Sequence, residues 1–266
     1  VLEQSGISAL PKTWDEFVEQ CRLVKSKTGK YAHAVHADCS TLNGMIYSMG
    51  GNIVEQKTTL YDSEPALAAL HIYETLHREE LAYLIPPGSY YDNMALSKGE
   101  IAFVLRSSSG LGDMMLLMEN DPEGWGMVCI PQRNPQSPAT VLYGPNICIF
   151  NTTEAQKRAA WAFVKHFTEP ESAVRWSLET GYLPVRKSAL VHPDMAAFWE
   201  KFPYNRAAYD CLSFARPEPN LTGWQHVRDL AARTITEIMT GMKNAEDAAK
   251  TLKQEADEAL RQAAGF

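Results

Sequence analysis

Helical and strand patterns alternate along this sequence, and that alternation constrains the fold more than any other feature. Apolar residues recur at helical spacing over 14–28, where Thr13 and Glu16 form a capping box. Turn and capping signals predict further helices over 43–51, after Ser63, after Thr153, from Pro170 to Gly181 and from Trp224 to Ala264 with a break near Gly241 and Asn244. Short apolar segments predict strands within 31–38, 101–105, 125–131 and 139–150. This alternation is typical of an α/β protein.

The composition excludes several classes of protein. The chain has 266 residues, which suffices for one large or two modest domains with their own cores. The net charge of −7 argues against a nucleic-acid partner, because a phosphate backbone requires clustered Lys and Arg. No apolar run approaches the roughly 18 residues that a membrane-spanning helix needs.

The five cysteines support neither a zinc site nor a complete disulfide framework, because their number is odd and no CxxC spacing occurs. Cys129 and Cys148 lie on two predicted strands that are close in sequence, so these two could pair. We favour the alternative that the cysteines are buried free thiols.

No catalytic signature is evident. Gly50 and Gly51 follow a helix and lack the GxGxxG spacing of a dinucleotide site. The seven histidines show no HExxH spacing, and the serine loop at 106–110 lacks the GxSxG pattern of a strained nucleophile.

Four short polar loops are candidate ligand contacts, although each taken singly is more often an ordinary turn. They span 35–40, 106–110, 142–146 and 180–186. In open α/β sheets, ligands bind outside the carboxyl ends of the strands. In the last loop, Gly181 predicts a left-handed helix end and Pro184 restricts the chain behind Tyr182, whose ring offers a flat face and a polar tip to a ligand.

Several segments follow one another in an order that carries a family resemblance. They are LPKTWDEF, a helix ending in GG, ALSKGEIAF, GWGMVCIP and the block from Trp161 to Ala189 with TGYLPVRKSA. In this order they resemble the extracellular solute-binding proteins of ABC sugar importers, most of all the branch that binds glycerol 3-phosphate and related compounds. The resemblance covers nearly the whole chain, and its last block is the most specific part.

The resemblance implies a periplasmic-binding-protein-like two-lobe α/β fold (type II) that closes on a sugar, polyol or polyol phosphate and delivers it to ABC permease subunits. It also implies that the protein is no enzyme, has no cofactor or metal, and works in the periplasm or outside the cell. A lipid anchor would have to precede Val1.

Members of this family are longer and begin with a signal peptide and the first half of the N-terminal lobe, so we expect that lobe to be incomplete here. Residues 1–123 would form the first part of the C-terminal lobe, 124–181 a returning piece of the N-terminal lobe, and 182–266 the helical remainder of the C-terminal lobe. A truncated lobe should leave sheet edges unpaired and apolar surface exposed.

Four residues match ligand positions of the family. The resemblance implies a serine contact from Ser107, a close backbone approach at Gly144, an aromatic contact from Tyr182 in TGYLP, and an anion partner in Arg228. A guanidinium fork fits phosphate oxygens, whereas a surface ion pair with Asp229 or Glu237 is the simpler alternative for this arginine.

The sequence departs from the branch where two tryptophans would enclose the ligand, at positions 37 and 40. Ala37 and Ser40 stand there instead, beside His36 and Asp38. The three polar residues among them, His36, Asp38 and Ser40, join the candidate site. The departure leaves open which solute is bound.

Two other interpretations remain. A hydrolase of sugars or phosphate esters could use Asp38, His36 and Ser107, although the sequence offers no spacing that places a base beside a nucleophile. The chain could also be a fragment that only packs against another chain.

Overall fold

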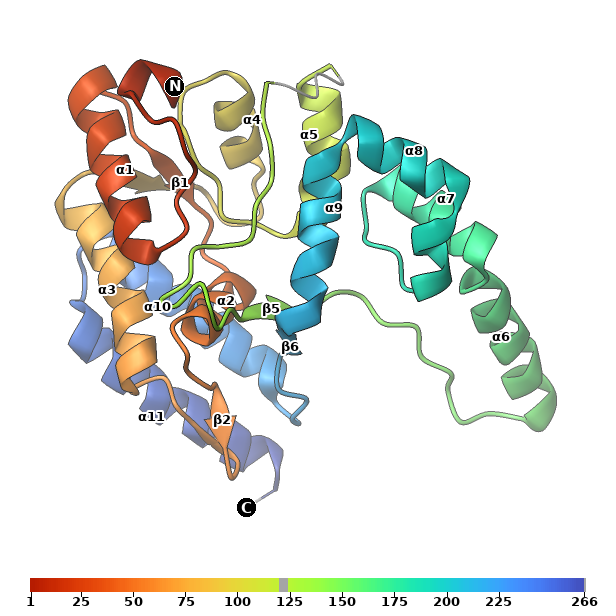
Figure 1. The fold of residues 1–266 in the computed structure, drawn as a ribbon. Helices are drawn as coiled ribbons and strands as arrows, with labels where there is room; N and C mark the ends of the chain where they lie inside the picture. Colours follow the sequence, from red (N-terminus) through yellow and green to blue (C-terminus); the bar gives the residue numbers. More distant parts are fainter. Residues whose placement is uncertain (120–123, 266) are drawn as a thin grey trace. The chain divides into compact units, whose positions relative to one another are not determined.

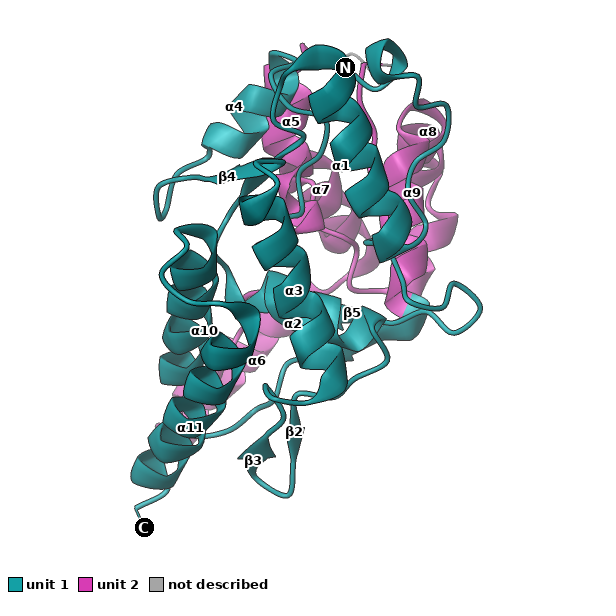
Figure 2. Cartoon of the chain, turned by 90° about the vertical axis from the view of Figure 1, so that its left-hand side faces the viewer, with its two compact units in different colours: residues 1–106, 130–143, 213–266 teal, residues 107–129, 144–212 magenta. Residues whose placement is uncertain are grey.

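The computed structural model describes residues 1–119 and 124–265, and the chain separates into two compact units, coloured in Figure 2. Unit 1 is formed by the described residues of Val1–Arg106, Ile130–Tyr143 and Ser213–Phe266. Unit 2 is formed by those of Ser107–Cys129 and Gly144–Leu212.

Unit 1 holds every strand of the described chain and its longest helices (Figure 1). Its elements are η1 (Glu3–Ser5), α1 (Trp14–Thr28), β1 (His33–Val35), α2 (Cys39–Ser48), β2 (Val54–Glu55), β3 (Thr58–Thr59), α3 (Glu64–Arg78), β4 (Ala82–Leu84), α4 (Tyr91–Ser97), β5 (Thr140–Leu142), β6 (Ala215–Pro217), α10 (Trp224–Met239) and α11 (Ala245–Ala263).

Every regular element in the described residues of unit 2 is a helix. Its elements are η2 (Ser108–Gly110), α5 (Leu111–Leu117), α6 (Glu154–Phe167), α7 (Pro170–Thr180), η3 (Lys187–Val191), α8 (Pro193–Lys201) and α9 (Pro203–Asp210), while η4 (Cys211–Phe214) spans its last boundary. None of the described helices of the chain combines the length and the apolar character that a membrane crossing requires.

Each sheet in unit 1 has two strands. β1 pairs with β4 in parallel, with Val35 opposite Leu84, and a further parallel bridge joins His33 to Phe103. β5 pairs with β6 in parallel, and β2 with β3 antiparallel. The carboxyl ends of β1, β4 and the segment around Phe103 therefore lie at one edge, where ligand loops are expected in α/β folds.

The core of unit 1 follows the helical spacing of the sequence. On α3 the predicted stripe is fully buried: it consists of Ala66, Ala69, Leu70, Tyr73 and Leu76. The predicted capping box of α1 is present, with Thr13 accepting the Glu16 N–H and Glu16 accepting from the Thr13 N–H. These two features confirm the predictions for the first helices.

The C-terminal helices α10 and α11 pack against each other and against α3. They break where the sequence predicts, because Gly241 adopts a left-handed conformation and the Asn244 side chain caps α11 by accepting the Asp247 N–H. An apolar face on each helix, including Ile235 and Leu252, is fully buried in the core.

A disulfide in unit 2 corrects the cysteine prediction. Cys129 pairs with Cys211, 82 residues later, with their Cα atoms 6.4 Å apart. Cys148, which the sequence suggested as the partner, is free and exposed, and Cys21 and Cys39 are buried thiols. The pairing was missed because it depends on how α9 returns toward residue 129, which local sequence does not encode.

Several predicted strands are wrong. Of the segment 139–150 only Thr140–Leu142 is a strand, 125–131 forms none, and 101–105 makes only the bridge at Phe103. Val128, Ile147 and Phe150 are exposed. An apolar segment stays extended as a strand only if a partner strand satisfies its backbone, and these segments have no such partner in the described residues.

The helix α6 exposes apolar surface. Its capping box between Thr153 and Gln156 is present as predicted, yet none of its residues is buried, and Trp161 and Phe163 are more than half exposed. This exposure agrees with the expectation of uncovered apolar surface. In the described chain each sheet has only two strands, so none of them is the complete sheet of a lobe.

The assignment of 1–123, 124–181 and 182–266 to lobes of a longer protein stays a prediction. The two contact-based units have other boundaries, since 182–212 belongs to the same unit as 144–181, and 130–143 belongs to the unit of 1–106. The boundary predicted at 123 lies outside the described residues.

Candidate functional site

The seven candidate residues fall into two groups. Unit 1 contains four of them: His36, Asp38, Ser40 and Arg228. Unit 2 contains the other three: Ser107, Gly144 and Tyr182. Each group is described by itself.

In unit 1 the structure brings Asp38, Ser40 and Arg228 together. The Arg228 Nη1 donates to Ser40 Oγ at 2.8 Å, and its Nη2 lies 3.6 Å from Asp38 Oδ1. These residues are separated by about 190 positions in sequence, and their meeting depends on α10 packing beside α2. Asp229 and Glu237, the surface partners considered above, do not pair with Arg228.

The start of α2 fixes Asp38 and Ser40. Asp38 is the N-cap, and its Oδ2 accepts from the Thr41 backbone N–H at 2.9 Å and from the Thr41 hydroxyl at 3.2 Å. Ser40, on the first turn of the helix, is completely buried. The helix thus begins four residues earlier than predicted, and the loop at 35–40 is partly helical.

Glu218 is a functional candidate that the sequence analysis missed. It follows the carboxyl end of β6, and its carboxylate binds the Arg228 Nη1 directly. It also accepts from Asn43 Nδ2 at 3.2 Å and from Trp224 Nε1 at 3.5 Å. The only available signal was the carboxyl end of a strand, but a three-residue strand with sequence ARP gives no strand pattern.

We name this group the Arg228 cluster. It consists of Asp38, Ser40, Asn43, Glu218 and Arg228. Burial by itself lowers the pKa of Arg228, but the Glu218 carboxylate and other neighbours raise it above its usual range. The guanidinium is therefore always charged, and two carboxylates, those of Asp38 and Glu218, face it.

Beneath the cluster lies a buried polar layer. Tyr61 Oη donates to Asn43 Oδ1 at 3.1 Å, and Asn43 Nδ2 also contacts Cys39 Sγ at 3.3 Å. Burial, followed by the Glu218 charge, raises the pKa of Cys39 to about 12, so this thiol stays protonated. The layer supports the cluster rather than offering a nucleophile.

His36 belongs to a second polar group at the same edge of unit 1. Burial and then the Arg106 cation lower the pKa of His36, which keeps its ring neutral near pH 7. Arg106 pairs with the fully buried Asp92 at 2.6 Å and lies over the ring of Tyr90. Tyr90 is exposed, and the sequence analysis had not selected it.

In unit 2, Ser107 and Gly144 each stand directly after a boundary with unit 1. The Ser107 hydroxyl accepts from the Ser109 N–H at 3.3 Å and contacts the Ser109 hydroxyl at 3.0 Å. Gly144 is exposed, and a Cβ built there would meet no atom within 4 Å. Its backbone is therefore open to close approach.

Tyr182 is partly exposed and follows the left-handed end of α7, as predicted. Gly181 has φ of +76°, and a Cβ there would lie 2.8 Å from the Gly112 nitrogen, so only glycine fits. The Tyr182 ring packs 6.2 Å from Trp176, which in turn contacts Phe167.

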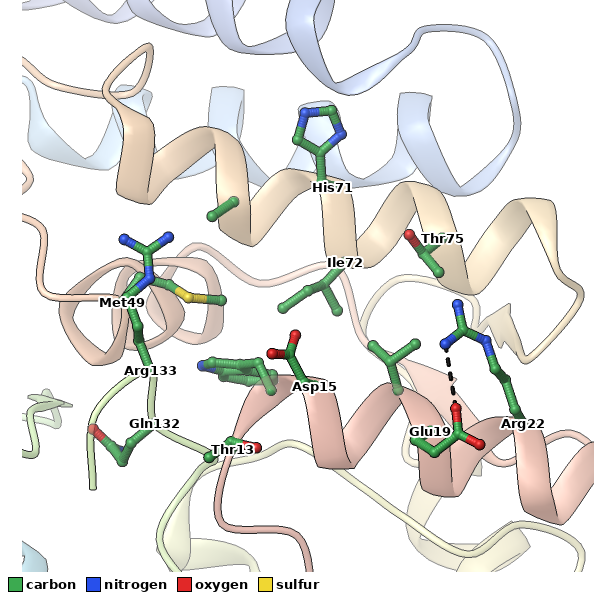
Figure 3. A pocket seen from close by; sticks show the side chains of 13 residues that line it. Thr13, Asp15, Glu19, Arg22, Met49, His71, Ile72, Thr75, Gln132 and Arg133 are labelled. Atoms are coloured by element: carbon green, nitrogen blue, oxygen red, sulfur yellow. Dashed lines mark hydrogen bonds and ion pairs between the residues drawn. The ribbon is translucent and has the colours of Figure 1, made fainter.

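A groove lies on unit 1, between α1 and α3 (Figure 3). This groove of about 750 Å³ is lined by charged side chains, among them Asp15, Glu19, Arg22 and Arg133, over apolar ones such as Ile72. Arg22 and Glu19 pair across one turn of α1. None of the candidate residues lines the groove.

One group could in principle offer metal ligands. Atoms of His71, Glu74 and Glu246 lie within 4.8 Å of one another. Each nitrogen of the His71 ring faces a different carboxylate, at 3.1 Å for Glu74 and 3.3 Å for Glu246. Both ring nitrogens of His71 thus have a carboxylate neighbour already.

The groups considered for a hydrolase have other partners within their own units. The Asp38 carboxylate is engaged by Thr41 and Arg228, and the Ser107 hydroxyl contacts Ser109. Nothing here supports a nucleophile activated by a base.

Comparison with known proteins assigns the chain to a family. The family of bacterial extracellular solute-binding proteins matches residues 1–203. The chain is 21% identical over 283 aligned residues to the sn-glycerol-3-phosphate-binding periplasmic protein UgpB of Agrobacterium fabrum, and spans 64% of that relative's length.

Solved structures show the same fold at low sequence identity. The sugar-binding protein MalE from Xanthomonas citri matches with a TM-score of 0.84 at 20% identity, over 98% of this chain and 66% of that one. UgpB from Mycobacterium tuberculosis, in complex with glycerophosphocholine, matches with a TM-score of 0.78 at 21% identity, over 98% and 67%. The predicted periplasmic-binding-protein-like fold is thereby confirmed.

Proposed function

Because this chain belongs to the bacterial extracellular solute-binding proteins, we propose that it is the part of an ABC importer that captures a sugar, polyol or glycerol-3-phosphate-like solute. In this role the protein binds and releases the solute without altering it. The relatives are named as binding proteins for sn-glycerol 3-phosphate and for sugars, which supports this solute class.

The observation that carries the proposal is the meeting of Asp38, Ser40 and Arg228 in unit 1. Three residues selected from sequence converge where α2 begins, directly after β1, which is where α/β folds bind ligands. Their oxygens and N–H groups suit the hydroxyl groups of a polar solute. We propose the remaining candidates, His36, Ser107, Gly144 and Tyr182, as further contacts.

We place the protein in the periplasm or outside the cell, with ABC permease subunits as its partners. The Cys129–Cys211 disulfide supports this location, because disulfides persist in oxidising compartments. A lipid anchor at an upstream segment is compatible with this placement.

The test is calorimetric titration of the full-length protein with maltose, trehalose, sn-glycerol 3-phosphate and glycerophosphocholine. We expect at least one solute to bind and Arg228→Ala to weaken its binding about ten- to a hundredfold, the loss of a charge-assisted contact. Chromogenic glycosides and phosphate esters should remain uncleaved.

The matched control is Arg233→Ala, on the same helix α10, whose guanidinium pairs with Glu237 and Glu255 outside the cluster. This variant should bind as wild type does. Turnover of a chromogenic substrate, or equal affinity of Arg228→Ala and wild type for every solute, would contradict the proposal.

A further inference from the structure

We propose that the Arg228 cluster selects against anionic solutes and that Glu218 is the residue that sets this selectivity. The inference rests on the proposed function, since it specifies the charge of the solute that the same site takes. The solute class is an uncharged, hydroxyl-rich molecule such as a saccharide or polyol, rather than a phosphate monoester.

One nitrogen of the Arg228 guanidinium is fully engaged. Nη1 carries two N–H groups, and these reach Ser40 Oγ and the Glu218 carboxylate. Nη2 faces Asp38 Oδ1 at 3.6 Å. Bidentate binding of a phosphate needs two parallel N–H groups of the fork. Because Nη1 is occupied, only the edge formed by Nε and Nη2 is left for it, and there the phosphate would meet the Asp38 carboxylate.

The local charge opposes an anion. One guanidinium and two carboxylates leave the cluster with a net charge of −1. The side chains of Arg228, Asp38 and Glu218 are only 24%, 21% and 11% exposed, so water and salt screen their charges weakly. A phosphate dianion beside Arg228 would also lie beside both carboxylates, and its repulsion from them would offset the attraction to the guanidinium.

Both carboxylates are held in place from several sides. Glu218 is bound by Asn43 Nδ2 and approached by Trp224 Nε1, and Asn43 itself is fixed by the buried Tyr61 hydroxyl. Asp38 is fixed by its cap contacts to Thr41. An incoming anion could therefore not displace either group without breaking several hydrogen bonds.

The same arrangement fits hydroxyl groups. A hydroxyl both donates and accepts, so it can donate to a carboxylate oxygen while it accepts from a guanidinium N–H. Asp38 and Glu218 flank Arg228, which provides this combination on each side of the guanidinium. Neighbouring hydroxyl groups of a saccharide or polyol match the pattern without adding charge.

The test measures the thermal stabilisation and calorimetric affinity of sn-glycerol 3-phosphate, inorganic phosphate, maltose and trehalose with the full-length protein. Wild type should bind neither anion up to 10 mM. Glu218→Gln keeps the shape of the side chain and removes one negative charge, so it should bind sn-glycerol 3-phosphate at least tenfold more tightly than wild type does.

The matched control is Glu237→Gln on α10 of unit 1, whose carboxylate pairs with Arg233 and Lys243 and is similarly shielded from solvent. It should leave the anion affinity unchanged. The wild-type measurements stand by themselves if Glu218→Gln fails to fold.

Two results would overturn the inference: tighter binding of sn-glycerol 3-phosphate than of either sugar by wild type, or no gain in anion affinity in a folded Glu218→Gln. Anion binding by wild type would still support the proposed function. Conversely, a gain in Glu218→Gln combined with no solute bound by wild type would retain the inference about charge and count against the proposed function.

Discussion

His33 links the stability of unit 1 to pH. Its ring is 2% exposed, and its Nδ1 lies 2.9 Å from the Phe103 carbonyl oxygen, to which it donates. Burial lowers the pKa of His33 below the value of about 6.5 in an unfolded chain. Below pH 6.5 the unfolded chain therefore takes up a proton that the folded protein does not, and the free energy of unfolding falls by up to about 1.4 kcal/mol per pH unit.

Urea denaturation between pH 7.5 and 5 measures this dependence. In His33→Gln the free energy of unfolding should fall less steeply toward low pH than in wild type. Some decline should remain, because burial also lowers the pKa of His36, which contributes in the same direction. A His166→Gln variant, with a ring at the surface, serves as the control. An unchanged slope in His33→Gln would contradict this account.

At single positions, the sequence predicted which residues belong to the candidate site better than it predicted which residues they contact. Arg228, Asp38 and Ser40 were selected as candidate ligand contacts, and the structure brings them together. The partner considered for the arginine, however, was an anionic solute or a surface carboxylate. Glu218 was not predicted, because its contact with Arg228 requires β6 to pair with β5, a pairing without local signal.

Among the elements, the end of α7 depends most on one residue. Ala at Gly181 would need a left-handed backbone, and its Cβ would lie 2.8 Å from the Gly112 nitrogen and 2.9 Å from the Leu111 Cβ. Gly181→Ala should therefore lower the free energy of unfolding by about 1–3 kcal/mol. Gly126→Ala, where the nearest atom is 3.9 Å away, should change it little. Equal thermal unfolding curves for the two variants would refute the argument.

Helix α6 should make the chain of 266 residues prone to association. Trp161 and Phe163 expose more than half of their surface, which is unusual for aromatic side chains grouped on one helix. We expect residues 1–266 alone to bind the dye ANS and to self-associate in light scattering, and Trp161→Lys/Phe163→Glu to reduce both. A monomer that does not bind the dye would contradict this prediction.

Helices were predictable because their signals are local, whereas strands were not. The caps at Thr13 and Thr153 and the stripe of α3 depend on residues three or four positions apart. The segments 125–131 and 143–150 have strand composition but no partner strand in the described chain. Composition alone cannot supply the partner on which a strand depends.

For the molecule as a whole, the Cys129–Cys211 disulfide is a covalent crosslink within unit 2. It closes a long loop, because the two cysteines are 82 positions apart in the sequence. Loss of such a crosslink costs up to about 4 kcal/mol, mainly by freeing the unfolded chain. Cys129→Ser/Cys211→Ser should therefore melt at a lower temperature, as should wild type in reductant.

Cys148→Ser is the control, because that thiol is free and exposed. Melting curves that coincide for the double variant and wild type would contradict the disulfide. The two-unit organisation could be anticipated only as a family fold, since the four points at which the chain passes between units, at 106/107, 129/130, 143/144 and 212/213, carry no distinct sequence signal.

The central claim is that a polar solute contacts the Arg228 cluster, and a crystal structure of the full-length protein with its tightest-binding solute tests it most directly. The account predicts solute oxygens within hydrogen-bond distance of Arg228 and of Asp38 or Glu218, at the start of α2. A solute bound elsewhere, for example in the groove between α1 and α3, with the Arg228 cluster untouched, would contradict it.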